Sequence, residues 1–247
     1  MEHFLDSNDT IAPGLGFAHF DALHLSWLAL FLAVVVVNCI WYKKLSENGK
    51  DRWKKAVAVV LLVCEVIKIS MHLIAGNFIW DNLPLHLCGI NIFLIAIHAW
   101  KPNKTLSNFL YTVCIPGAMA ALLFPNWTKL PLLNFFHIHS SIAHILLVLY
   151  PLVLAINGEL KPSFKQMPKC LGLLALMAIP IYGLNLLLGS NFMFLMYAES
   201  NNPLYWFEQN WGSHLLGFPV IIAGVMIVMY LPMELYRKLK KEIPKIN

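Results

Sequence analysis

Charged residues are scarce in this chain of 247 residues. Asp, Glu, Lys and Arg together make up 13% of it, and apolar residues make up 59%. A soluble domain carries about 25% charged residues. The composition therefore excludes an ordinary soluble enzyme and predicts a protein that is embedded in lipid.

Several sequence motifs are also absent. The five cysteines show no CxxC or metal-type spacing, so no disulfide framework is predicted. No glycine-rich phosphate loop, dinucleotide fingerprint, internal repeat or low-complexity tract occurs. Residues 1–23 contain no Lys or Arg, and so they lack the charged start of a secretory signal. We therefore expect the first apolar segment to be retained.

Seven long apolar runs account for most of the chain, at about 24–42, 56–75, 83–100, 106–124, 137–157, 170–188 and 214–236. Each is close to the roughly 20 residues that a helix needs to cross a hydrocarbon core. The runs lack the alternation of barrel strands, and a backbone in lipid must satisfy its own hydrogen bonds. The predicted fold class is all-α, a polytopic membrane protein with a seven-transmembrane helix bundle in which every span is α-helical.

Basic residues predict the orientation of this bundle. All but two of the 18 Lys and Arg, namely Lys68 and Lys129, fall in alternate loops or near the C-terminus. By the positive-inside rule that side is cytoplasmic, so the N-terminus is expected outside and the C-terminus inside. The predicted parts are an extracytoplasmic segment 1–23, a transmembrane domain 24–236 and a basic cytoplasmic tail 237–247. The net charge of +5 is then explained by anionic lipid headgroups rather than by nucleic acid.

Polar residues inside the spans are informative because they are costly in lipid and usually face a partner or a wet cavity. One face of the second span carries three of them: Glu65, Lys68 and His72. One face of the fifth span carries four: His137, Ser140, Ser141 and His144. His139 is predicted to point elsewhere.

The predicted orientation places most of these groups in the outer half of the membrane. The same half contains polar residues of three other spans: His86, Cys88, Asn91, Asn185 and His214. His98, at the cytoplasmic end of the third span, is the exception and is expected to be interfacial. Four tryptophans are expected to form the outer aromatic belt: Trp80, Trp127, Trp206 and Trp211. We therefore predict a polar site in the outer half.

A purely structural interpretation exists for each of these residues. Glu65 and Lys68 can neutralise each other, and Ser140 and Ser141 can bond their own helix backbone. The other four cysteines are expected to pack as small hydrophobic side chains: Cys39, Cys64, Cys114 and Cys170. Convergence of several helices at one depth nevertheless favours a site.

Three other kinds of site fit less well. A zinc site needs tighter ligand spacing than the sequence shows. A haem would need paired axial histidines at matched depth, for which His72 and His144 are candidates. A channel or transporter is compatible with the polar face of the second span. However, the polar residues stop near mid-depth and leave the predicted cytoplasmic half nearly dry, whereas a pathway would need polar groups through the full depth. No metal and no cofactor is predicted.

Acyl transfer through a nucleophile suits the residues best, because it needs a thiol or hydroxyl, an imidazole base and donors for the oxyanion. His86 and Cys88 are about 200° apart on a regular helix, so the base for Cys88 must come from another span. His144 is the best candidate, with His137 and His72 behind it. Asn91 shares the face of Cys88 as a possible oxyanion donor. Pro84 suits the first turn of a helix that begins there.

Three segments resemble a known family: LPLHLC at 83–88, SIAHILLVLYPLV at 141–153 and YGLNLLLGSNFMFL at 182–195. They look like the YwaF-type integral membrane proteins of Gram-positive bacteria. These are related to vertebrate transmembrane protein 164, an acyltransferase that makes polyunsaturated ether phospholipids. The resemblance runs from about residue 20 to residue 236.

The resemblance implies a nucleophile at Cys88 and an essential histidine at His144, seven residues before Pro151. It also implies a supporting stretch of the form N-x-x-x-G-[ST]-N, which Asn185, Gly189 and Asn191 match. The extra His137 and His139 depart from the family pattern, so the resemblance assigns them no role.

The sequence therefore predicts an acyltransferase of a cell membrane, expected to be a bacterial plasma membrane. It would move a fatty acyl chain between phospholipid and lysophospholipid through a Cys88 thioester. The alternative is a non-catalytic lipid or small-molecule binding protein, or a transporter, that uses the same cavity. The acyl donor and acceptor, the choice between transfer and hydrolysis, and the oligomeric state stay open.

Overall fold

The computed structural model describes residues 2–198 and 203–242. As predicted, these residues contain seven helices that are long and apolar enough to span a membrane. They are α1 (Ala22–Lys44), α2 (Glu47–Ala75), α3 (Leu87–Trp100), the pair α4 (Lys104–Phe109) and α5 (Ile115–Leu123), α6 (Phe135–Ile156), α7 (Met167–Leu188) and α9 (Gly217–Glu242). A short helix, α8 (Pro203–Trp211), and four single turns of 3-10 helix complete the described part, which contains no strand.

The helix starts follow from side chains that accept hydrogen bonds from the first free backbone N–H groups. Asp21, Ser46, Asn103 and Asn134 cap α1, α2, α4 and α6 in this way. The Asp21 carboxylate accepts from the N–H of His24 at 2.8 Å and of Ala18 at 3.0 Å. These bonds stabilise its charged form and hold the pKa of Asp21 below its usual value.

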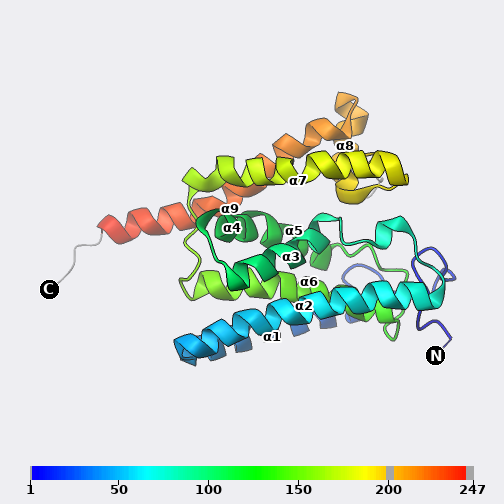
Figure 1. Ribbon diagram of the computed structural model, residues 1–247, viewed down its shortest axis with the longest axis horizontal. Helices are drawn as coiled ribbons and strands as arrows, with labels where there is room; N and C mark the ends of the chain where they lie inside the picture. The colour runs from blue at the N-terminus through cyan, green and yellow to red at the C-terminus, as the bar shows by residue number, and fades with distance from the viewer. Residues whose placement is uncertain (1, 199–202, 243–247) are drawn as a thin grey trace.

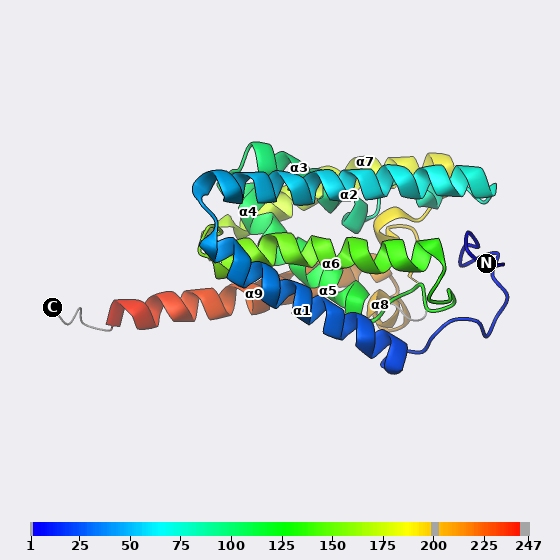
Figure 2. The same cartoon turned by 90° about the horizontal axis from the view of Figure 1, so that it is seen from below.

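The spans are arranged in layers around the fourth one (Figure 1). α1, α2 and α6 lie on one side of α3, α4 and α5, and α7 and α9 lie on the other. Figure 2 shows α2 running alongside α6 while α1 crosses α6 obliquely. Two apolar cores join the layers: one is centred on the fully buried Tyr150 and Leu110, and the other on Phe192 and Tyr230.

The N-terminal segment and the end of α9 lie at opposite ends of the bundle (Figure 1), as an odd number of crossings requires. The orientation of these ends relative to the cytoplasm stays a prediction. α9 continues as a helix through 237–242, the first part of the predicted tail, and residues 243–247 lie outside the described part.

The fourth span is not a regular α-helix, contrary to expectation. Leu110–Cys114 forms a wider π-helical turn between α4 and α5. Pro116 explains the break, since proline has no N–H and its ring clashes with the carbonyl four residues earlier. The span can therefore stay continuous only by widening before the proline.

His98, which we expected from the sequence to be interfacial, is buried inside the protein with 4% exposure, and its depth in the membrane stays a prediction. Its Nδ1 lies 2.9 Å from the Tyr150 hydroxyl and its Nε2 lies 2.9 Å from the Ser107 hydroxyl. Both ring nitrogens thus have partners on other helices, which removes the cost of burying them. Asn108 and Thr112, on the fourth span, are buried as well.

Candidate active site

The LPLHLCG segment (83–89) turns sharply before α3 begins. We expected Pro84 to lie in the first turn of the helix. Instead, His86 is the N-cap residue, and Pro84 lies in a turn before the helix. The reason is close packing of this turn on the helix. A Cβ atom on Gly89 would come within 2.7 Å of the Pro84 backbone. Only glycine leaves room for the proline turn.

Cys88 is the second residue of α3, and its side chain is half-buried against the core that contains Tyr150. Within the described part of the chain, its thiol is recorded in no hydrogen bond. The His86 side chain makes no cap bond to the start of α3, unlike the cap residues of α1, α2, α4 and α6. The first N–H groups of α3 beside Cys88 are therefore not satisfied by the cap side chain.

His144 lies near the middle of α6, where two contacts fix its ring. Its Nδ1–H donates to the Ser140 carbonyl at 2.7 Å, and the ring stacks on Trp127 with centroids 5.1 Å apart. Because Nδ1 carries the proton in this arrangement, Nε2 of the neutral ring is an acceptor. Among the described residues, no hydrogen bond joins His144 to Cys88.

Trp127 does not belong to an outer aromatic belt, contrary to our expectation. Its side chain is only 5% exposed, whereas Trp80, Trp206 and Trp211 are 50% exposed or more. The stacking on His144 and the packing against Leu130 and Phe136 explain its burial. No sequence signal distinguished this tryptophan from the other three, because the loop that carries Trp127 reaches His144 through folding and not through closeness along the chain.

Lys68 lies on α2, a helix that packs against both α3 and α6. Its ammonium nitrogen lies 2.5 Å from Oε1 of Glu65, and the two side chains form an ion pair. It also lies within electrostatic range of four histidines: His72, His86, His139 and His144. The structure thus brings α2, α6 and the start of α3 together at this depth.

His139 does not point away from these groups, although the helical wheel separates it from His144. It faces Cys64 of α2 and lies within electrostatic range of Lys68, His72 and His144. Its Nε2 is buried and has no hydrogen-bond partner among the described residues. A helical wheel gives only the angle of each residue around α6. Because α2 packs alongside α6, it can contact residues on more than one face of α6, including His139.

His137 is fully buried and lies apart from the Lys68 group, although it shares a helix face with His144. Its Nδ1 bonds the Leu130 carbonyl at 2.9 Å, and its ring packs against Phe17 and Trp27. Seven residues separate it from His144, which amounts to about 10 Å along the helix. His137 therefore stabilises the cap formed by the N-terminal segment and the loop before α6.

His72 has a similar structural partner. Its Nδ1 bonds the Asn77 side chain at 2.8 Å, and its ring stacks on Phe136 at 3.9 Å. Asn77 in turn bonds the Leu5 carbonyl at 2.9 Å, which ties α2 to the N-terminal segment.

The predicted supporting residues Ser140, Ser141 and Asn91 lie on α6 and α3. Ser141 and Asn91 are both 2% exposed, and Ser140 contributes its carbonyl to His144. Oδ1 of Asn91 is buried without a hydrogen-bond partner in the described part of the chain. Asn91 therefore has unused bonding capacity one helical turn after Cys88.

Asn185 and Asn191 build the loop that follows α7. Asn185 accepts from the Ser190 hydroxyl at 2.9 Å and the Phe192 N–H at 2.8 Å, and it donates to the Phe192 carbonyl at 3.0 Å. Asn191 bonds the backbone of Met196 and Tyr197. Gly189 ends α7 in the left-handed conformation with φ of 63°, which suits glycine.

This loop holds His86 in place. The Met193 N–H donates to His86 Nδ1 at 3.3 Å, and the His86 ring packs against Phe192 and Phe194. Met193 and Phe194 both have left-handed backbones, with φ of 57° and 56°. Such conformations are strained for side chains of this size and persist only where the surroundings enforce them.

Replacing Asn185 with Ala is expected to lower the free energy of unfolding by about 1–3 kcal/mol, since three hydrogen bonds to a buried loop are lost. Thermal unfolding of the purified protein in detergent measures the effect. Asn157→Ala is the control, because its amide makes one bond, at 2.9 Å, to the Val153 carbonyl of its own helix. Equal destabilisation by both changes would contradict this role of Asn185.

Among the described residues, no three His, Cys, Asp or Glu side chains lie together as metal ligands would. The fold and the placed residues define a multi-pass helical membrane protein with titratable side chains between its helices. The model of the TMEM164 family matches residues 15–230, and the chain belongs to this family. No curated protein and no solved structure matches the chain.

Proposed function

We propose that this protein is a membrane acyltransferase that moves a fatty acyl chain from a phospholipid to a lysophospholipid or a related amphiphile through a thioester on Cys88. The observation that carries the proposal is the position of Cys88 at the start of α3, where the N-cap side chain leaves the first N–H groups unbonded. A helix N-terminus favours a thiolate and supplies N–H donors for an oxyanion.

In the first half of the reaction, Nε2 of His144 takes the proton of the Cys88 thiol. The sulfur attacks the ester carbonyl carbon, the bond from that carbon to the glycerol oxygen breaks, and the protonated His144 returns its proton to that oxygen. A lysolipid leaves, and the acyl chain stays on Cys88. The hydrogen bond that Nδ1 gives to Ser140 supports this role, because it fixes the tautomer that leaves Nε2 free to accept.

In the second half, His144 takes a proton from the acceptor hydroxyl, whose oxygen attacks the thioester carbonyl carbon. The bond from that carbon to sulfur breaks, and the protonated His144 returns its proton to the Cys88 sulfur. Both halves require the sulfur and Nε2 to come within hydrogen-bond distance when lipid is bound. Catalytic hydrogen bonds often tighten only in the substrate complex. We assign the Lys68 ammonium to the lipid phosphate, because it lies within electrostatic range of both His86 and His144.

Membership of the TMEM164 family supports the conclusion that this chain is a membrane protein. We propose the finer assignments. These are the acyltransferase chemistry, the YwaF-type relationship, and a location in a bacterial plasma membrane with the Cys88 end outside. Phospholipids and lysophospholipids are the proposed partners.

The most direct test is mass spectrometry of the protein purified from its membrane. A fatty acyl adduct is expected on the peptide that contains Cys88, released by neutral hydroxylamine as a thioester would be. The mass of the adduct identifies the acyl chain. Peptides with Cys39 and Cys64, two other half-buried thiols, serve as internal controls and should stay unmodified. Acylation of these residues to the same extent would point to non-specific modification and contradict the proposal.

One observation favours the alternative of a non-catalytic lipid-binding protein or transporter. Within the described part of the chain the Cys88 thiol has no hydrogen-bonded base. A binding protein would retain phospholipid but form no acyl product with any lipid offered, and no adduct would appear on Cys88.

A further inference from the structure

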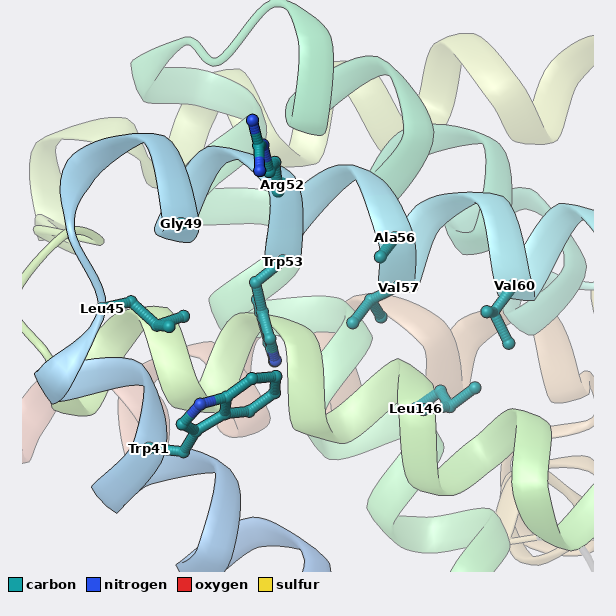
Figure 3. Close-up of a pocket in the computed structure, with 9 residues that line it drawn as sticks. All are labelled: Trp41, Leu45, Gly49, Arg52, Trp53, Ala56, Val57, Val60 and Leu146. Carbon is teal, nitrogen blue, oxygen red and sulfur yellow. The ribbon is translucent and has the colours of Figure 1, made fainter.

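A groove with a volume of about 470 Å³ lies between α1, α2 and α6 (Figure 3). Trp41 and Leu45 line it from the end of α1, and Leu146 lines it from α6. Leu146 is two residues from His144 but about 200° around the helix, so the groove lies on another side of α6 than the Lys68 group. It is therefore a separate feature from the candidate active site.

The length of the groove matches the thickness of the hydrocarbon part of one leaflet. On α2 it extends from Gly49 to Val60, which corresponds to about 16 Å of helix, or roughly half of a hydrocarbon core. Apart from Arg52 its lining is apolar, with Trp53 and Val57 at its centre. An apolar groove of this length suits a single acyl chain.

Arg52 is an exposed cation at the edge of this groove. The other three cations on the first turns of α2 are all paired: Lys50 with Glu47 at 2.8 Å, Lys54 with Glu159 at 3.2 Å, and Lys55 with Asp51 at 2.7 Å. Within the described chain, Arg52 is recorded in no ion pair or hydrogen bond. Its guanidinium is thus available to an external anion, and its planar fork matches a phosphate.

The apolar lining of the groove and the charged Arg52 side chain lie in different directions from α2 (Figure 3). In Figure 3, Trp53 extends from α2 toward Trp41, whereas Arg52 extends away from it. The floor of the groove is therefore apolar, and the cation lies at its rim. An amphiphile with an acyl tail and an anionic head has the same division.

We propose that the groove binds one anionic phospholipid from the leaflet beside the α1–α2 loop, with an acyl chain along Trp53 and Val57 and the phosphate at Arg52. A net-negative headgroup is favoured because basic side chains outnumber acidic ones around this loop. The proposal does not depend on the function assigned to Cys88. If the orientation predicted from the basic loops holds, this leaflet is the cytoplasmic one.

The test uses the full-length protein equilibrated in bilayers of equal parts dioleoyl phosphatidylglycerol and dioleoyl phosphatidylcholine. Lipids that stay bound after release into detergent are counted by native mass spectrometry. The wild type should retain phosphatidylglycerol in preference to phosphatidylcholine. Arg52→Gln should reduce phosphatidylglycerol retention about fivefold, as expected for one basic residue near an anionic headgroup. Lys101→Gln, which alters an exposed cation in another loop, should leave it unchanged.

A second pair of variants tests the acyl part of the site. Ala56 lines the groove and is exposed, so Ala56→Phe should fill the groove without disturbing the core and should abolish the preference. Val59 is exposed on the same helix and does not line the groove, so Val59→Phe should behave as the wild type. Cys88→Ala should also retain the lipid.

Three outcomes would overturn the proposal. Equal retention of the two lipids, unaffected by Arg52→Gln, would remove the headgroup site. Complete displacement of the bound lipid by inorganic phosphate would indicate a phosphate site without an acyl component. A dimer that Ala56→Phe dissociates would show that the groove receives a second copy of this chain.

Discussion

Cys88→Ala is expected to lower acyl transfer by at least about a thousandfold, because the reaction proposed here has no other nucleophile and a covalent route is lost entirely. The measurement is the transfer of a labelled acyl chain from phospholipid to lysophospholipid by the purified protein in mixed micelles. Cys88 is half-buried, and the change removes only one sulfur atom, so the variant should fold. Its thermal unfolding midpoint provides that check.

Cys39→Ala is the matched control, since it removes a half-buried thiol from α1. It should keep wild-type activity. His144→Asn should lower the rate by about a hundredfold to ten-thousandfold, the usual contribution of a general base, while leaving bound lipid in place. Full activity in both Cys88→Ala and His144→Asn would refute the catalytic assignment and leave the lipid-binding alternative.

Gly89→Ala is expected to destabilise the start of α3 by about 1–3 kcal/mol, the usual cost of forcing an extra carbon into a packed region. The added Cβ would lie 2.7 Å from backbone atoms of Pro84, and backbone cannot move aside as a flexible side chain does. Pro84, His86 and Cys88 would shift together. Acyl transfer should therefore fall even where the protein still folds, and the thermal midpoint should drop.

Gly183→Ala is the control for this change. Gly183 also lies inside a helix, and a Cβ there would meet nothing within 4 Å. Alanine has a higher helix propensity than glycine by about 1 kcal/mol, so this variant should be as stable as the wild type or slightly more stable. A Gly89→Ala protein as stable and as active as Gly183→Ala would show that the proline turn is not tightly packed.

The spans were the most predictable part of this fold, because the requirement for roughly 20 apolar residues leaves few alternatives. The predicted 24–42 lies within α1, and the predicted 137–157 differs from α6 by one or two residues at each end. Local chemistry was harder to predict. The position of Pro84 before the helix depends on a contact with Gly89, which the pattern of apolar residues does not encode.

The candidate site was predicted in part. The offsets of Glu65, Lys68 and His72 correctly placed one polar face on α2, since that inference needs only helical geometry. Contacts between segments were missed. Trp127 reaches His144 from a loop, and His98 finds Tyr150 52 residues away. A helical wheel describes one helix at a time and contains no information about such neighbours.

The π-helical turn at Leu110–Cys114 has a consequence for any change of length in the fourth span. A π turn adds one residue to a helix, so every side chain after it is rotated by about 100° from the position an unbroken helix would give it. If Leu110–Cys114 became regular α-helix without a change in length, Ala118 and Leu122, both buried, would turn out of the core, whereas deleting one residue from the turn would restore regular geometry and leave them facing the core. The registry of this central span therefore depends on the irregular turn, so substitutions that make the turn regular without shortening the span would disrupt the packing around it.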